Sequence, residues 1–115
     1  MILYHITDEG SWTRALTAGA YSPEAFPVDG FIHCSKAPQV LAVAQRFYAV
    51  RSDLVLLMID ADLVAPEIVF ENLEGGTEQF PHIYGRLNIE AVVKVTAFSP
   101  DAAGEFHLPG NQAGE

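Results

Sequence analysis

The residues Leu54-Val55-Leu56-Leu57-Met58-Ile59 form a continuous apolar run near the middle of the chain. A strand that faces water on one side alternates apolar and polar residues, whereas a strand buried on both faces does not. The run therefore predicts a central β-strand covered on both sides. Residues 60–62 then supply polar side chains for a turn, so we expect the rest of the fold to assemble around this strand.

The N-terminal part of the chain predicts a strand followed by a helix. Residues 2–6 are mostly apolar, and Thr7 and Asp8 offer side-chain oxygens of the kind that cap helix N-termini. Apolar residues then recur at helical spacing until Gly19, which is a natural stop. The apolar positions of this helix are Trp12, Ala15 and Leu16. We expect Trp12 to pack in the core rather than to bind a ligand.

The next segment predicts an irregular connection, a second strand and a second helix. Residues 21–30 contain prolines and the turn pair Asp29-Gly30, and residues 31–34 indicate a short strand. Ser35 is expected to cap the second helix. The apolar stripe of this helix consists of Val40, Val43, Ala44 and Phe47.

Shorter elements complete the predicted fold. The pattern indicates a strand at 68–70, a loop at 73–79, a helical turn at 88–91, a strand at 91–98 and a short edge strand at 105–108. The polar residues 110–115 are expected to fray. Together these elements predict one α+β domain over residues 1–115, with a small curved or split β-sheet and two main helices.

The composition limits the classes of function. Lys and Arg total 6 against 15 Asp and Glu, and the net charge of -9 disfavours non-specific nucleic-acid binding. There is no apolar run of about 18 residues and no basic-then-apolar N-terminus, so we expect neither a membrane span nor a secretory signal. One cysteine, Cys34, cannot form an internal disulfide, and a cytoplasmic location is the simplest expectation. The oligomeric state stays open.

A histidine followed two residues later by a hydroxyl side chain occurs three times. The triplets are His5-Ile6-Thr7, His33-Cys34-Ser35 and His82-Ile83-Tyr84, each at the end of a predicted strand. Positions i and i+2 of a strand share a face, so each triplet should present an imidazole and a hydroxyl on one side. Three converging strand ends would form a hydrogen-bonding pocket. The alternative for each triplet alone is structural, with the polar groups serving as caps.

The same alternation places Cys34 on the face opposite His33. We therefore expect a buried, unreactive thiol rather than a Cys–His dyad. Zinc is a further possibility for three histidines, but these lie on separate segments with no close ligand spacing and no evident acidic partner. No metal site is predicted. His107, with no hydroxyl two residues later, is expected to be structural or exposed.

The chain resembles a family of small bacterial proteins known as Domain of Unknown Function 952. The resemblance covers nearly the whole chain, and Arg86 stands where the family is associated with proline. It implies no established activity. The motifs that carry it are Tyr4-His5-Ile6-Thr7, Gly19-Ala20-Tyr21, Gly30-Phe31-Ile32-His33-Cys34-Ser35, Leu56-Leu57-Met58-Ile59-Asp60, Phe80-Pro81-His82-Ile83-Tyr84-Gly85-Arg86-Leu87-Asn88 and Gly104-Glu105-Phe106-His107-Leu108-Pro109.

The opening strand, the His-x-Thr triplet and the glycine-ended helix also resemble the first motif of the ADP-ribosyltransferase superfamily, which includes the RNA 2′-phosphotransferases. This resemblance implies an ADP-ribosyltransferase-like core in which His5 holds a ribose hydroxyl of NAD, a possible co-substrate. It places residues 31–35 on the second motif, with Ser35 on the ribose. Where the third motif usually carries a catalytic glutamate, this chain has His82.

These features lead to the hypothesis of a pocket for a small nucleotide-like ligand, such as NAD, ADP-ribose or a 2′-phosphate group. An enzyme of this kind would be an ADP-ribosyl- or phosphotransferase. The alternatives are a non-catalytic ligand-binding module of the same fold and a metal-dependent hydrolase. The predicted catalytic residues are His5, His33 and His82, and the predicted ligand-binding residues are Thr7, Tyr21, Phe31, Ser35, Tyr84 and Gly85.

Overall fold

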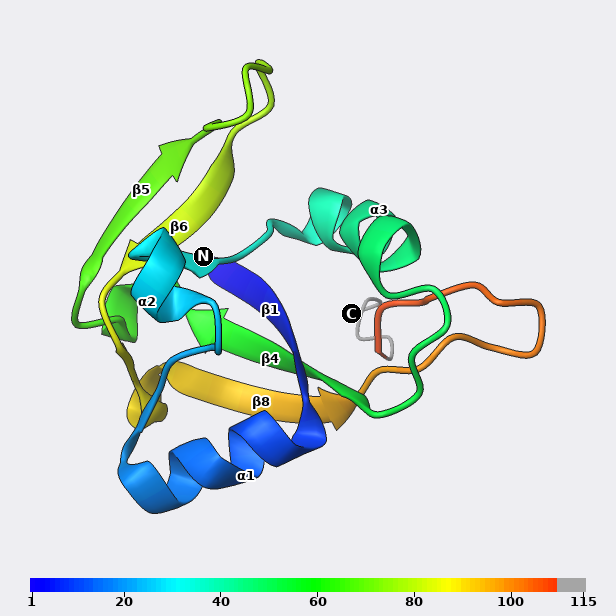
Figure 1. Cartoon of the computed structure of the whole chain (residues 1–115), viewed down its shortest axis with the longest axis horizontal. Coiled ribbons are helices and arrows are strands. Elements are labelled where there is room, and N and C mark those ends of the chain that lie inside the picture. The colour runs from blue at the N-terminus through cyan, green and yellow to red at the C-terminus, as the bar shows by residue number, and fades with distance from the viewer. Residues whose placement is uncertain (110–115) are drawn as a thin grey trace.

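Strand β4, Leu54–Asp60, is the middle strand of a three-stranded antiparallel sheet in the computed structural model, which describes residues 1–109 (Figure 1). It pairs with β1, Ile2–Asp8, on one side and with β8, Val92–Ala97, on the other. Leu56 and Leu57 point to opposite faces, and both are completely buried. The predicted central strand with two covered faces is therefore confirmed. The predicted frayed tail, 110–115, lies outside the described residues.

Two smaller antiparallel sheets accompany the β4 sheet. One pairs β2, Ala20–Tyr21, with β7, Leu87–Asn88. The other has the order β3-β6-β5, formed by Ile32–His33, Phe80–Tyr84 and Glu67–Glu71. In Figure 1 the β5–β6 hairpin extends away from the β4 sheet. The α+β class is confirmed. The sequence predicted a small curved or split sheet, and the strands of residues 1–109 are divided among several small antiparallel sheets. The ADP-ribosyltransferase-like core stays a prediction.

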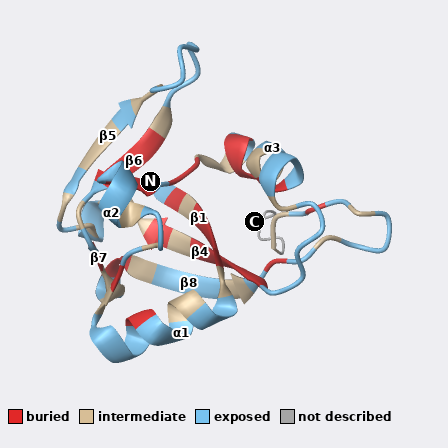
Figure 2. Ribbon diagram, in the orientation of Figure 1, coloured by how far each residue is buried: buried red, intermediate tan, exposed pale blue. Residues whose placement is uncertain are grey.

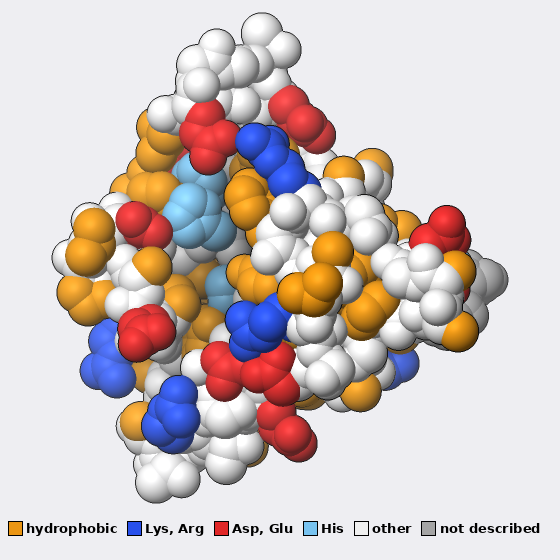
Figure 3. All heavy atoms as spheres, turned by 45° about the vertical axis from the view of Figure 1, so that its right-hand side comes forward, with side chains coloured by type: hydrophobic (Ala, Val, Ile, Leu, Met, Phe, Trp, Pro, Cys, Tyr) orange, Lys and Arg blue, Asp and Glu red, His pale blue; other side chains and the backbone are white. Residues whose placement is uncertain are grey.

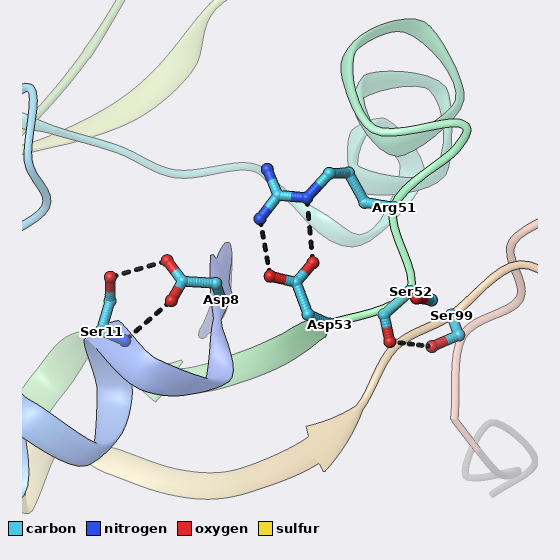
Figure 4. Close-up of polar contacts among 6 residues, drawn as sticks. All are labelled: Asp8, Ser11, Arg51, Ser52, Asp53 and Ser99. Carbon is cyan, nitrogen blue, oxygen red and sulfur yellow. Dashed lines mark hydrogen bonds and ion pairs between the residues drawn. The ribbon is translucent and has the colours of Figure 1, made fainter.

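Helix α1, Glu9–Ala18, follows β1 as the sequence predicts. The Asp8 carboxylate accepts hydrogen bonds from the backbone N–H of Ser11 at 2.9 Å and from its hydroxyl at 2.7 Å (Figure 4). This N-cap satisfies a donor that the first helical turn leaves free. Gly19 ends the helix at φ 88°, in the left-handed region that favours glycine. The first helix therefore has the predicted start and stop.

Helix α3, Ala37–Phe47, begins later than predicted, and Ser35 is not its cap. The backbone of Ser35 instead exchanges two hydrogen bonds of 2.8 Å with Tyr4 of β1. Strand pairing thus keeps Ser35 in an extended segment, and Lys36 takes the N-cap position. The Gln39 side chain accepts a hydrogen bond from the Lys36 N–H at 2.8 Å, which completes the start of the helix.

The structure changes two further predictions about local elements and confirms a third. The connection at 21–30, predicted to be irregular, contains the short helix α2, Phe26–Asp29. The edge strand predicted at 105–108 does not form, because that segment follows a turn in which Asp101 accepts hydrogen bonds from the Ala103 and Glu105 N–H groups. The predicted turn at 88–91 is confirmed as the 3-10 helix η2, Ile89–Ala91, and a similar turn, η1, Ala61–Leu63, follows β4.

The two faces of the β4 sheet support two apolar cores (Figure 2). On the Leu57 face, Trp12 of α1 packs against the core as predicted. The buried members of this core include Leu3, Ala15, Tyr21, Ile32, Cys34, Ile59 and Ile83. The core on the Leu56 face includes Ile6, Val40, Ala44, Phe98 and Phe106. No helix within residues 1–109 has the length and apolar character needed to cross a membrane.

Candidate functional site

The β3-β6-β5 sheet gathers two of the three predicted histidines on one face. His33 lies opposite His82 across the β3–β6 ladder, and His82 lies opposite Val69 of β5. Because side chains alternate along a strand, the residues two positions away share this face. We call the resulting set the histidine face and define it as Phe31, His33, Glu71, His82 and Tyr84. Figure 3 shows histidine side chains inside a hollow of the surface, with acidic side chains beside them.

Glu71 joins His82 and Tyr84 on this face. Its carboxylate accepts a hydrogen bond from His82 Nδ1–H at 2.8 Å and another from the Tyr84 hydroxyl. The bonds from Tyr84 and then His82 lower the pKa of Glu71, which keeps this carboxylate ionised. The same bond to Glu71 raises the pKa of Tyr84. Since Nδ1 of His82 carries the proton, Nε2 carries the lone pair of the neutral ring.

Phe31 forms the aromatic centre of the histidine face. Its ring stacks on His82 with centroids 4.2 Å apart and an interplanar angle of 23°. The His33 and Tyr84 rings lie 4.6 and 5.2 Å from it. Phe31 and His82 are buried, whereas His33 and Tyr84 are exposed. The His82 imidazole is therefore covered, whereas the His33 imidazole and the Tyr84 ring are exposed on the same face.

His33 presents the accessible imidazole of the site. Its Nε2–H donates to the Asp29 carboxylate at 3.1 Å, and 58% of its side chain is exposed. Asp29 is the last residue of α2, four residues before His33. The His33 and His82 rings meet edge-on with centroids 5.2 Å apart. Each of these two imidazoles is therefore oriented by its own carboxylate.

His5 adjoins the histidine face but points into the core. Its Nδ1–H donates to the backbone carbonyl of His33 at 2.6 Å, and its Nε2 accepts from the Tyr21 hydroxyl at 2.7 Å. Burial lowers the pKa of His5 to about 4, although the bond to His33 opposes this effect. Both ring nitrogens are thus used inside the protein, and the ring is neutral at pH 7.

Tyr21 and Thr7 lie beside His5 in the interior. The Tyr21 ring is almost fully buried and meets the His5 ring edge-on at 5.2 Å between centroids. Burial raises the pKa of Tyr21, an effect that hydrogen bonding with Thr7 partly offsets. Thr7 is itself buried. Both predicted ligand-binding residues therefore support the His5 position from within the core.

The remaining predicted site residues are placed by backbone packing. Ser35 is buried next to Tyr4, whereas His33 of the same triplet is exposed, so these two side chains do not open to a common surface. Gly85 lies against Pro66. A Cβ atom added to Gly85 would lie 2.7 Å from the Pro66 Cβ and 2.9 Å from its Cγ. Packing against Pro66 therefore requires glycine at this position.

Substituting Gly85 by alanine should destabilise the protein by about 1 to 3 kcal/mol, because the new methyl group overlaps a proline ring that cannot change rotamer. Urea unfolding measures the change. The matched comparison is the same substitution in a Pro66→Gly background, where the colliding atoms are gone and the added cost should be small. An equal cost in both backgrounds would contradict the packing explanation.

Cys34 occupies the face opposite His33, as alternation predicts. It is buried in the core on the Leu57 face, and burial raises the pKa of its thiol. A buried thiol with a raised pKa is a poor nucleophile. His107 is exposed and hydrogen-bonded to Asp101 at 2.8 Å, so it lies outside the histidine face.

The sequence reasoning missed the carboxylates that accompany the histidines. It took the absence of an evident acidic partner as an argument against zinc, but Glu71 and Asp29 contact His82 and His33. Asp29 stands four residues before His33 and could have been noticed, whereas the Glu71 contact requires the β5–β6 pairing.

Within residues 1–109, one group of three side chains is close enough to share a metal ion. It consists of the exposed residues Asp101, Glu105 and His107.

Comparison with solved structures finds the same fold in CC0527 from Caulobacter crescentus. Its crystal structure is 28% identical in sequence and superposes with a TM-score of 0.83, covering 94% of this chain and 95% of that chain. The crystal structure of a double mutant of CC0527 gives the same values. The solution NMR structure of CC0527 gives a TM-score of 0.79 over 90% of each chain. No curated protein matches the sequence.

A family model supplies the classification. The model described as "Protein of unknown function (DUF952)" matches residues 6–95, which include every residue of the histidine face and all of the His-x-hydroxyl triplets except His5 itself. The matched part covers well over half of the chain and agrees with the motifs noted in the sequence. The protein is therefore a member of the DUF952 family.

Proposed function

We propose that the histidine face binds a small nucleotide-like ligand, that His33 holds a ligand hydroxyl and that His82 is the acid–base group. The observation that carries the proposal is the Glu71–His82 contact, in which a carboxylate holds one imidazole nitrogen and leaves the other available. Among residues 1–109, Nε2 of His82 has no hydrogen-bond partner. An unused nitrogen on a covered ring is a common feature of catalytic histidines.

The expected role of His82 follows from its tautomer. Nε2 would accept a proton from a ligand hydroxyl while Nδ1–H remains bonded to Glu71. The Glu71 carboxylate would stabilise the imidazolium that forms while the bond from the ribosyl carbon to the nicotinamide nitrogen breaks. Neutral nicotinamide would leave with the bonding electrons, water would add to the ribosyl carbon and release one proton to solvent, and His82 would return its proton to the ligand hydroxyl. The Tyr84 hydroxyl donates to the same Glu71 oxygen, Oε2, and would keep this carboxylate in place.

His33 would make the first contact with the ligand because its ring is exposed. With Nε2–H bonded to Asp29, its Nδ1 would accept a hydrogen bond from a hydroxyl such as those of ribose. The exposed Tyr84 ring offers a surface for a planar base, and Phe31 supports the rings from below. Hydroxyls and a planar ring occur together in NAD and ADP-ribose, so these are the probes of choice.

His5 takes a different part in this proposal from that implied by the ADP-ribosyltransferase resemblance. Because its nitrogens bond to the His33 carbonyl and the Tyr21 hydroxyl, it would position the His33 backbone instead of holding ribose.

Asp29 and Glu71 add negative charge near the ligand, and the protein carries a net charge of -9. We therefore expect weak binding of a dianion, with a dissociation constant on the order of micromolar to millimolar.

The test is an NMR titration of the full chain with NAD and with ADP-ribose, followed by an assay for nicotinamide release. The variants are His82→Gln and Glu71→Gln, and the matched control is His107→Gln, a histidine with its own carboxylate away from the site. Binding should shift resonances of His33 and Tyr84 in the wild type and in the control. His82→Gln should lower any turnover by about 100-fold or more while changing affinity little.

The outcomes separate the alternatives. Ligand shifts without nicotinamide release, together with affinity losses in His82→Gln, would favour the non-catalytic binding module. Absence of shifts at His33 and Tyr84 with millimolar NAD and ADP-ribose would refute the nucleotide proposal. Equal effects of His82→Gln and His107→Gln would exclude a special role for the Glu71–His82 contact.

A further inference from the structure

A second recess lies between α1, β2 and the segment that joins β6 to β7. Its volume is about 410 Å³, and it shares no residue with the histidine face. Two arginines stand in its lining although the whole chain has only 6 basic residues. The polar and charged residues that line it are Asp8, Ser11, Arg14, Ser22, Glu24 and Arg86.

The two arginines of this recess lack carboxylate partners among residues 1–109. Arg14 donates a hydrogen bond to the Ser11 hydroxyl at 3.1 Å and forms no ion pair. The Arg86 side chain forms neither a hydrogen bond nor an ion pair within the described residues. Arg51 shows the contrast, because both arms of its guanidinium bond to the Asp53 carboxylate at 2.9 Å (Figure 4). In a strongly acidic chain, two unpaired guanidinium groups around one recess are available to a ligand.

Among residues 1–109, the acids in the lining form no direct ion pair with these arginines, although the charge of Arg14 contributes, after the hydrogen bonds from Ser11, to the lowered pKa of Asp8. Both oxygens of Asp8 are occupied by the Ser11 N–H and hydroxyl, where they cap α1. The bonds from Ser11 lower the pKa of Asp8, so its carboxylate stays charged. Both carboxylate oxygens bond to the first turn of α1. Glu24 is exposed and has no hydrogen bond within the described part of the chain. Its charge would oppose a ligand that carries several negative charges.

We infer that this recess binds one oxyanion group of a small ligand between Arg14 and Arg86. Guanidinium groups match the planar oxygen pairs of carboxylate and phosphate, and the Ser22 hydroxyl can donate a further hydrogen bond. The Ser11 hydroxyl donates to Asp8 and accepts from Arg14, so it helps to orient Arg14. The shared chemistry is a single anionic group with two or three acceptor oxygens. The inference is independent of the proposed chemistry at the histidine face, because it uses other residues.

The test is a titration of the full chain with inorganic phosphate and, separately, with acetate, at constant ionic strength. Backbone amide resonances of Ser11 and Ser22 and the guanidinium Nε–H resonances report binding. The variants are Arg14→Gln and Arg86→Gln, and the control is Arg46→Gln, whose guanidinium lies over the Phe47 ring on α3. All three substitutions remove one positive charge, so the long-range field of the protein changes equally.

Arg14→Gln and Arg86→Gln should each raise the apparent dissociation constant at least about fivefold, and Arg46→Gln should change it less than about twofold. Glu24→Gln should tighten binding, because it removes an opposing charge. A preference for phosphate over acetate, or the reverse, identifies the anion class. Equal losses in the three arginine variants, or no shift of Ser11 and Ser22 with either anion at about 20 mM, would overturn the inference. Unchanged thermal unfolding of the variants separates lost binding from lost folding.

Discussion

Replacing Leu57 by alanine should lower the free energy of unfolding by about 3 to 5 kcal/mol, the range for a leucine truncated in a well-packed core. Leu57 lies in the middle of β4, is 0% exposed and belongs to the core that covers one face of the β4 sheet. The strands on both sides hold its backbone in place, so the surrounding side chains can collapse only partly into the cavity. Urea unfolding followed by circular dichroism measures the loss.

Leu16→Ala is the matched control for this prediction. It removes the same atoms from α1, but Leu16 is 53% exposed and leaves no closed cavity. Alanine also favours a helix slightly more than leucine does. The control should therefore change the free energy of unfolding by less than about 1 kcal/mol. Similar losses in the two variants would mean that β4 is not the centre of the packed core.

Acidification should destabilise the protein by about 3 kcal/mol between pH 6.5 and pH 4 through His5 alone. Its pKa is lowered from 6.5 to about 4 in the folded state, and each pKa unit corresponds to about 1.4 kcal/mol. Between these pH values the unfolded chain binds a proton that the folded chain rejects. Stability from this group is therefore complete above pH 6.5, falls as the pH decreases, and changes no further below pH 4.

The measurement is the free energy of unfolding at several pH values for the wild type and for His5→Asn. Asparagine does not titrate, so the variant should show a flatter profile between pH 6.5 and 4 even if it is less stable at pH 7. Acidic residues with lowered pKa values, such as Asp8 and Glu71, affect stability at lower pH and are present in both proteins. His107→Asn is the control, because it removes an exposed histidine and leaves His5 in place, so the loss of stability that His5 causes on acidification should persist. Parallel profiles for wild type and His5→Asn would refute the prediction.

Local patterns predicted the parts of the fold whose cause is local. The six apolar residues of β4 required cover on both faces, and Asp8 and Gly19 marked the ends of α1 through their own capping chemistry. Burial of Cys34 followed from strand alternation next to His33. Ser35 shows the limit of such reasoning, because a pairing with Tyr4, far away in the sequence, overrode its preference for a helix cap.

The sequence by itself determined the family, the α+β class and the three histidine triplets. Tertiary structure decided what each histidine can do. Pairing of β5 with β6 brought Glu71 to His82, and α2 brought Asp29 to His33. The backbone bridge between Tyr4 and Ser35 brought His5 to the His33 carbonyl. The triplets are alike in sequence, but burial and hydrogen-bond partners are set by segments distant in the chain. These partners fix the tautomers and protonation states on which any chemistry depends.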